Sequence, residues 1–369
     1  MFFATVLIAA VAGITAAAEP SLSRALAMRA ADVLQSKFFT WYGLWDCGVF
    51  AARETVSQPR KAGSWWNCAN SLEALANEVA YSGNTTYAGV FSRTWYSTAA
   101  QHPIHKEFSG LDDIQWWALA WLRVSEVSGN ASYLSRSRDI FDEVTKYWDD
   151  TCGGGVWWDR KRSYKNAITN ELFITLAAAL HQKEGGTNSS YLDWALRGWR
   201  WFNATGMLTT DGIVDGLGGA PACSAGGAKY TYNQGVILGG LGLLHDIEAN
   251  SAYLDAATRI ADAAVHRFGE AKGGILTEDC EPDCNHDGEQ FKGIFVRYLG
   301  YLATRLPAAT RPRKKYARTL LANVNSLIAN ATNGDGAFGL QWGGPVGEVD
   351  GITHTSGFDL LNAAVVAAA

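Results

Sequence analysis

The chain has 369 residues, a formal net charge of -5 and 12% aromatic residues, including fifteen tryptophans. This length exceeds that of most single domains, but no stretch rich in proline, serine or charge divides the chain, so we expect one large domain. The negative charge, with no basic run beyond residues 311–315, excludes a nucleic-acid-binding surface.

The first 18 residues are apolar and end in three alanines before Glu19 and Pro20. Such a segment is typical of a secretory signal peptide, although no Lys or Arg lies near its start. A membrane anchor is the alternative, but the segment is short for a membrane span. We therefore predict a signal peptide over residues 1–18, a secreted domain over residues 19–369, and no stable membrane span.

Twelve segments with apolar residues at helical spacing follow, separated by Gly-rich loops. They predict helices over residues 21–38, 67–82, 85–100, 111–128, 131–149, 168–183, 189–204, 230–248, 251–269, 289–305, 312–330 and 355–367. The connections are short after even-numbered helices and mostly long after odd-numbered ones, which indicates stacked helical hairpins. Six hairpins that close on each other form an (α/α)6 barrel. We predict this all-α fold in a single domain, although an open helical solenoid would show the same alternation.

In such a barrel the even-numbered helices are the inner ones, and all begin at the same end. Polar and aromatic residues stand at their starts, in residues 65–67, 112–113, 170–171, 230–234, 289–292 and 354–355. Trp, Tyr and Gln are not preferred helix caps. The sequence therefore predicts a ligand site at this rim. The long loops also contain similar short segments, each with glycine followed by apolar residues: 152–158, 211–214, 273–276 and 335–338.

Asp112 and Asp113 precede a tryptophan pair, Trp116 and Trp117, at the start of the fourth helix. Paired carboxyl groups can divide the work of glycosidic bond cleavage, one as general acid and base and the other as nucleophile or water activator. Acidic residues in a first helical turn also complement the helix dipole and cap its amides, which is a purely structural interpretation. The shared polar rim favours catalysis.

Six cysteines, an even number, predict disulfides in a secreted chain, and only Cys280 and Cys284 are close enough for a local pair. No second Cys or His pair completes a zinc site. Residues 283–288 resemble the first half of a calcium loop, but Ile294 stands where an EF-hand requires Glu. We predict no metal and no cofactor. Five sequons predict N-glycosylation, at Asn84, Asn130, Asn188, Asn203 and Asn330.

Five segments resemble glycoside hydrolase family 76, the α-1,6-mannanases and their fungal cell-wall relatives: residues 65–70, 111–117, 169–173, 230–235 and 291–299. They occur in the family's order. The resemblance implies an (α/α)6 barrel and endo-acting hydrolysis of α-1,6-mannan with retention of configuration, with Asp112 as nucleophile and Asp113 as general acid and base. Geometry alone assigns neither role, because neighbouring helical residues splay about 100° apart.

The implied partner is α-mannan or a mannose-containing oligosaccharide, bound by a monomer. The rim residues that match the family's segments are candidate substrate-binding residues: Trp66, Asn67, Trp117, Asn170, Glu171, Tyr232, Asn233, Gln234 and Lys292. Structural roles are the alternative, such as an ion pair between Lys292 and Glu289 or tryptophans that only pack helices. A cell-wall transglycosidase and a catalytically silent glycan-binding protein are the alternative functions, and the intact Asp pair argues against the second.

Overall fold

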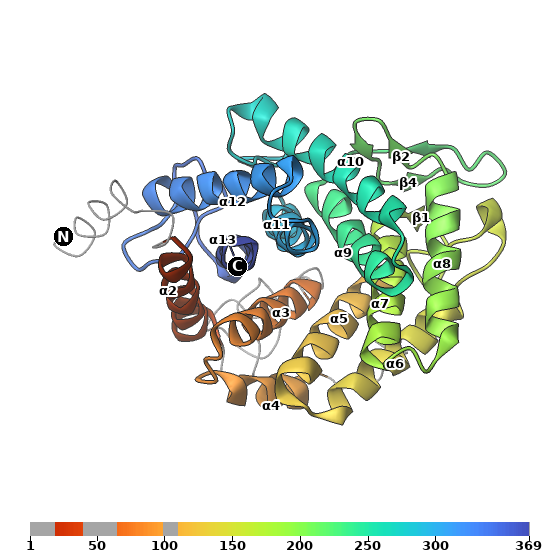
Figure 1. Ribbon diagram of the computed structural model, residues 1–369, viewed down its shortest axis with the longest axis horizontal. Helices are drawn as coiled ribbons and strands as arrows, with labels where there is room; N and C mark the ends of the chain where they lie inside the picture. The colour runs from red at the N-terminus through yellow and green to blue at the C-terminus, as the bar shows by residue number, and fades with distance from the viewer. Residues whose placement is uncertain (1–18, 40–64, 99–109, 369) are drawn as a thin grey trace, which may run out of the picture. The chain divides into compact units, whose positions relative to one another are not determined.

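The computed structural model describes residues 19–39, 65–98 and 110–368. Twelve α-helices make up most of the regular structure in these ranges (Figure 1). The chain forms two compact units, one from residues 88–267 and one from residues 1–87 together with 268–369. The predicted signal peptide and Cys47 lie outside the described residues. Within those ranges no helix combines the length and apolar character that a membrane span needs.

The unit of residues 88–267 is built from helical hairpins. Its helices are α4 (Ala88–Ser97), α5 (Leu111–Ser128), α6 (Ala131–Thr145), α7 (Ala167–Lys183), α8 (Ser189–Ala204), α9 (Thr231–Glu248) and nearly all of α10 (Ser251–Phe268). α5 packs on α6 and α7 packs on α8, while α7 also lies between α5 and α9 (Figure 1). The inner layer of this unit is therefore α5, α7 and α9.

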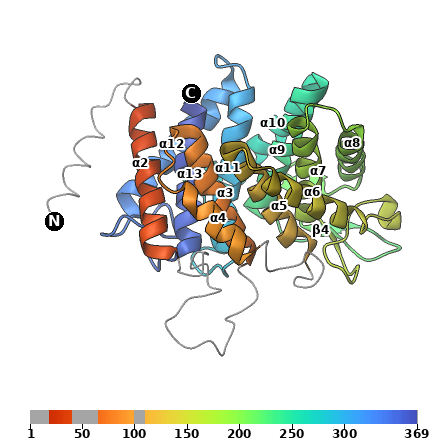
Figure 2. The ribbon, with the colours of Figure 1, turned by 90° about the horizontal axis from the view of Figure 1, so that it is seen from below.

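The other unit is centred on its C-terminal helix. Its helices are α2 (Glu19–Val33), which continues into the π-helix η1 (Leu34–Phe38), α3 (Trp65–Ser82), α11 (Gly288–Arg305), α12 (Arg311–Asn330) and α13 (Gly351–Ala368). α13 contacts α2, α3, α11 and α12 (Figure 2). Helices α3, α11 and α13 are therefore the inner helices of this unit.

Inner and outer helices differ in how much of their surface is buried. Inner helices such as α7, α9 and α13 are apolar or small-residue sequences that are buried on almost every side. Outer helices bury one stripe; in α8 this stripe contains Tyr191, Ala195, Gly198 and Phe202, at the spacing of an amphipathic helix. The alternation of inner and outer helices follows the predicted hairpins.

Most predicted helix bounds agree with the structure to within three residues, and two differ by four. α6 ends at Thr145 rather than 149, because Trp148 leaves the helix to form a β-bridge with Val156. α13 begins at Gly351 rather than 355. The reason is a cap that the hydrophobic pattern missed: Asp350 Oδ1 accepts the N–H groups of Ile352 and Thr353, at 2.9 and 2.8 Å.

Short antiparallel strands occur in the long loops, where no strand was predicted. β1 (Lys165–Asn166), β4 (Gly216–Leu217) and β5 (Ala225–Gly226) form one small sheet, with Lys165 opposite Leu217. β2 (Leu208–Thr209) and β3 (Gly212–Ile213) form a hairpin. These pairings join the loop that precedes α7 to the loop that precedes α9.

Two disulfides between described residues hold loops in place. Cys280 pairs with Cys284 before α11, as their spacing predicted. Cys152 pairs with Cys223, 71 residues away, and this bond again joins the loops that precede α7 and α9. Cys68 is buried in α3 and forms no disulfide with a described residue.

A buried ion cluster ties α3, α11 and α13 together. Arg297 donates to both carboxylate oxygens of Asp359, at 2.9 and 2.6 Å, and to Glu73 and Asn70, each at 2.8 Å. All four side chains are buried. Burial raises the pKa of Asp359 to about 7, although Arg297 opposes this. For Arg297, Asp359 and Glu73 outweigh burial and raise the pKa, so the guanidinium stays charged.

Candidate active site

The Asp pair occupies the first turn of α5 without being its cap. Gly110 is the N-cap residue, in extended conformation and with no side chain to accept a hydrogen bond. Asp112 and Asp113 are the second and third helical residues, and both are partly exposed. Asp112 Oδ1 accepts the N–H of Asp113 at 3.0 Å. A capping contact of this kind therefore involves Oδ1 of Asp112.

The two carboxyl groups converge over Gly110. A Cβ atom on Gly110 would lie 2.9 Å from Asp112 Oδ1 and 3.2 Å from Asp113 Oδ2. Two oxygens that both lie so close to one point are separated by no more than the sum of these distances. That sum is shorter than the roughly 6.5–9.5 Å between the carboxyl groups of inverting glycosidases. The structure thus supplies the proximity that the sequence left open.

This close approach makes Gly110→Ala an informative variant. The backbone angles of Gly110, φ -72° and ψ 126°, suit alanine, so we expect the fold to persist. The added methyl group would push Asp112 Oδ1 away and make Asp113 shift by a few tenths of an ångström; a misplaced catalytic group slows a reaction, about 100-fold for a shift of about 1 Å. For the reaction that the family resemblance implies, we expect kcat/KM to fall about 10- to 100-fold, with an unchanged circular dichroism spectrum. Gly89→Ala, where the methyl group meets open space, is the matched control; equal activity of both variants would contradict the prediction.

Trp158 lies beside Asp112. Its indole Nε1 donates to Asp112 Oδ2 at 3.0 Å, and 39% of the residue's surface is exposed. The main chain of Trp158 is held on both sides: its N–H donates to Tyr164 O, and its carbonyl accepts the N–H of Leu111, both at 2.7 Å. Trp158 was not among the predicted site residues. The similarity of residues 152–158 to segments of the other long loops was the feature of the sequence that could have indicated it.

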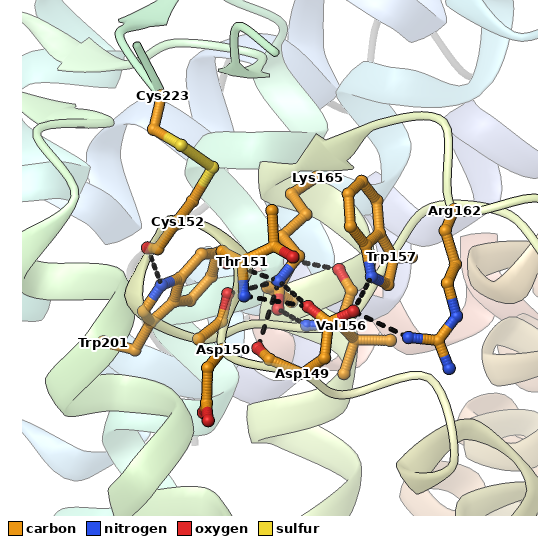
Figure 3. A network of polar contacts seen from close by, with 12 residues as sticks. Asp149, Asp150, Thr151, Cys152, Val156, Trp157, Arg162, Lys165, Trp201 and Cys223 are labelled. Atoms are coloured by element: carbon orange, nitrogen blue, oxygen red, sulfur yellow. Dashed lines mark hydrogen bonds and ion pairs between the residues drawn. A yellow bond between two sulfur atoms is a disulfide. The ribbon is translucent and has the colours of Figure 1, made fainter. Parts of the chain in front are cut away.

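A buried lysine holds the loop that carries Trp158 (Figure 3). Lys165 Nζ donates to Asp149 Oδ1 at 2.8 Å and to the carbonyls of Thr151 and Gly154, each at 2.7 Å. Trp157 Nε1 donates to the other oxygen of Asp149 at 2.8 Å. Burial opposes ionisation of Asp149, but hydrogen bonds from Lys165 and Trp157 lower its pKa, so the ion pair persists into acid solution.

Two predicted binding residues anchor the rim loops. Asn170 on α7 accepts the N–H of Val156 at 2.7 Å and donates to the carbonyl of the same residue at 3.0 Å. Gln234 on α9 makes the same pair of bonds to Ile213, at 2.7 and 2.9 Å. In both loops a buried apolar residue, Val156 or Ile213, is thus bound through its main chain by an amide side chain from an inner helix. A role for Asn170 and Gln234 in substrate binding remains a prediction.

Two further carboxyl groups of the same unit, one buried and one partly exposed, influence each other's charge. Glu171 on α7 is fully buried, and neither carboxyl oxygen has a hydrogen-bond partner among the described residues. Burial, reinforced by the charge of Asp215, raises the pKa of Glu171 well above its usual value. Asp215 accepts a hydrogen bond from Tyr164 at 2.9 Å, and burial raises its pKa although Tyr164 and the nearby Asn233 oppose this. Sequence analysis missed Asp215 and Tyr164.

The remaining aromatic candidates differ in exposure. Trp117 is 4% exposed and stacks on Trp121, with ring centroids 5.9 Å apart. Tyr232 is partly exposed and contacts Tyr230 edge to face. Trp158 therefore presents more open indole surface beside the Asp pair than Trp117 does, and the stacking role of Trp117 stays a prediction.

Three candidates belong to the other unit, where they bond to protein groups. Trp66 is 6% exposed, stacks on Phe291 and donates to Asp287 at 2.8 Å. Asn67 donates to Gln290 at 2.7 Å.

Lys292 is fully buried, donates to the carbonyl of Leu340 at 2.8 Å and lies over the Trp342 ring. It pairs with Glu281, not with Glu289 as the alternative interpretation expected. Burial lowers the pKa of Lys292, and Glu281 opposes this effect.

The same unit contains one group of side chains with the chemistry of metal ligands. Potential ligand atoms of His286, Glu289 and Asp350 lie within 4.8 Å of one another among the described residues. His286 already pairs with Glu289 at 3.2 Å, and Asp350 caps α13. These contacts account for the group within the protein, and the predicted absence of a metal remains a prediction.

Comparison with known proteins points to a single family of glycoside hydrolases. Residues 28–368 match glycosyl hydrolase family 76. A putative mannan endo-1,6-α-mannosidase of Schizosaccharomyces pombe is 28% identical over 300 residues, which are 75% of this chain and 67% of that protein. The mannan endo-1,6-α-mannosidase DCW1 of Candida albicans is 27% identical over 305 residues, which are 75% of this chain and 66% of that protein. The chain spans about two thirds of the length of these relatives.

Solved structures share the fold. The α-1,6-mannanase of Salegentibacter superposes with a TM-score of 0.81 at 24% identity, covering 94% of this chain and 99% of that one. Its inactive variant with two consecutive aspartates replaced by alanine was solved in complex with α-1,6-mannotetrose. Dfg5 from Chaetomium thermophilum, in complex with glucosamine, gives a TM-score of 0.76 at 18% identity, over 94% of this chain and 90% of that one. These similarities confirm the predicted all-α (α/α)6 barrel in a single domain.

Proposed function

The chain belongs to glycoside hydrolase family 76, and from this membership we propose that it cleaves α-1,6-mannosidic linkages within mannan with retention of configuration. The observation that carries the proposal is the convergence of Asp112 and Asp113 over Gly110. Carboxyl groups at short separation leave no room for a water molecule between one of them and the sugar, so one attacks the sugar itself. The named activities of the relatives supply the substrate class.

The surroundings of Asp112 support the roles that the resemblance implies. Asp112 accepts N–H donors from Trp158 and from Asp113, an arrangement that suits a nucleophilic carboxylate. Asp112 attacks the anomeric carbon while Asp113 gives its proton to the departing glycosidic oxygen. Asp113 then removes a proton from water, which attacks the same carbon and releases Asp112 from the glycosyl ester.

Several polar residues of the same unit are candidate groups for sugar hydroxyls. Asp215 and Tyr164 form a partly exposed hydrogen-bonded pair, and Tyr232 is partly exposed at the start of α9. Glu171 favours its neutral form, which donates a hydrogen bond as well as accepting one. We propose that these groups, with Asn233, bind mannose in this unit; substrate binding by Trp66, Asn67 and Lys292 stays a prediction from the resemblance.

Secretion is part of the proposal. Two disulfides require an oxidising environment. The five sequon asparagines are exposed or partly exposed, so their side chains are accessible to glycosylation. We propose that residues 1–18 direct export and that the remaining residues act outside the cell or in its wall.

Product analysis tests the reaction class. With linear α-1,6-mannan, we expect shortened oligosaccharides of mixed length, and proton NMR of the first products should show the α-anomer before mutarotation. A first β-anomer would indicate inversion and contradict the roles given to the Asp pair. Elongated oligosaccharides in excess of hydrolysis would favour a transglycosidase, and binding without any product would favour a glycan-binding protein.

A further inference from the structure

The contact between Trp158 and Asp112 joins a loop to the start of α5. Asp112 Oδ2 accepts the indole N–H at 3.0 Å, while Oδ1 accepts the main-chain N–H of Asp113 at 3.0 Å. One donor on each oxygen fixes the plane of the carboxylate. A nucleophilic carboxylate needs such a fixed plane, because only one lone-pair direction leads to the anomeric carbon.

Trp158 itself has little freedom to move away. Its two main-chain hydrogen bonds connect it to Tyr164 and to Leu111, the residue before Asp112. Asp159 adds an isolated β-bridge to Gly110. The indole and the carboxylate therefore sit on segments that are bonded to each other directly.

The rest of the loop is fastened independently of Trp158. Lys165 binds the turn at residues 149–154, and Cys152 is tied to Cys223 (Figure 3). Gly155 fits closely against Trp201, where a Cβ would come within 2.4 Å of the ring. A substitution at Trp158 thus leaves the supports of the loop in place, so its effect on Asp112 can be measured.

We propose that Trp158 is a positioning residue, whose indole N–H orients the Asp112 carboxylate and whose exposed face forms a stacking platform for the mannose ring beside it. This inference rests on the proposed function. When the glycosyl ester is hydrolysed, negative charge returns to Asp112, and the indole N–H stabilises the departing carboxylate. When the ester forms, Asp112 loses this negative charge and the hydrogen bond weakens. The indole N–H therefore assists hydrolysis of the ester more than the attack of Asp112 that forms it.

Trp158→Phe tests the N–H separately from the ring. Phenylalanine keeps an aromatic face but cannot donate, so we expect kcat to fall about 10- to 100-fold, as for a lost hydrogen bond to a charged group, with KM within about twofold. The ionised form of Asp112 loses a donor, so its pKa rises. Because the nucleophile must be ionised, the acid limb of kcat/KM should move to higher pH. Trp158→Ala should additionally raise KM severalfold, because the platform is removed.

Trp199→Phe on the outer helix α8 is the matched control, since Trp199 contacts Phe202 and not the Asp pair. It should keep the wild-type pH profile. If Trp158→Phe also kept the wild-type kcat and acid limb, the inference would be wrong even though the wild-type enzyme cleaves mannan. A loss of stability without a shift of the acid limb would show a merely structural role and would overturn it as well.

An NMR titration separates this inference from the proposed function. The indole N–H resonance of Trp158, identified by its loss in Trp158→Phe, should move with pH in the wild type and stay constant in Asp112→Asn. This readout does not require activity. An inactive wild-type protein with a titrating indole would reject the proposed function alone, whereas an indole that is insensitive to Asp112→Asn would reject the positioning role.

Discussion

Asp112→Asn is expected to reduce hydrolysis of α-1,6-mannan by about 10⁴-fold or more, and Asp113→Asn by roughly 10²–10⁴-fold. Asparagine has the shape of aspartate, but it neither forms the glycosyl ester nor transfers a proton. Both positions are partly exposed in the first turn of α5, so the fold should persist. Reducing-end release from linear mannan measures the loss. Asp139→Asn, at an exposed position on α6, is the matched control and should retain activity.

Azide distinguishes the two roles. With Asp113→Ala, azide should attack the ester on Asp112 and give an α-mannosyl azide, because two inversions retain the configuration. With Asp112→Ala, azide should replace the missing carboxylate in a single displacement and give a β-mannosyl azide. The opposite pattern would exchange the roles of the residues, and full activity of both Asn variants would remove the catalytic assignment altogether.

Arg297→Met should have the largest effect on stability, a loss of about 3–5 kcal/mol in the free energy of unfolding at pH 7. The methionine fills similar space but leaves Asp359 and Glu73 buried without their positive partner. Urea unfolding followed by tryptophan fluorescence measures the change. Arg123→Met removes a partly exposed pair with Glu126 on α5 and should cost no more than about 1 kcal/mol.

The effect of Arg297→Met should grow with pH. Burial raises the folded-state pKa of Asp359 to about 7, above its unfolded value, so the stability contributed by its protonation is present below about pH 4 and is lost as pH rises towards 7. Without Arg297 this loss extends to higher pH. The difference between the variant and the wild type should therefore be smallest in acid, well below pH 7, and should increase as pH rises through 7. Adding Asp359→Asn should restore part of the stability at pH 7; a double variant as unstable as the sum of the single ones would show that the pair does not interact.

Sequence patterns among nearby residues predicted most of the helices and one disulfide of this protein. The bounds of α5 and α8 follow directly from apolar spacing, because helix periodicity is a property of neighbouring residues. Cys280 and Cys284 were predictable for the same reason, since only three residues lie between them. α13 was predicted too short because its cap, Asp350, comes before the apolar pattern begins.

The candidate site was predictable only in part. The Asp pair was visible from its chemistry and its place at a helix start. Asn170 and Gln234 were visible as polar residues at the rim, but the sequence did not show that their amides bind loop backbone. Polar side chains at a rim serve a ligand or a loop equally well, and only the position of the loop distinguishes the two roles.

The helical segments, the alternation of short and long connections and the two adjacent carboxylates could be predicted, because each depends on residues that are neighbours in the chain. The groups that surround those carboxylates depend on the three-dimensional fold. Trp158 reaches Asp112 across 46 residues, and Cys152 reaches Cys223 across 71. Such contacts depend on how the loops fold back on the inner helices, since hydrogen bonds and disulfides require distances that sequence spacing does not fix.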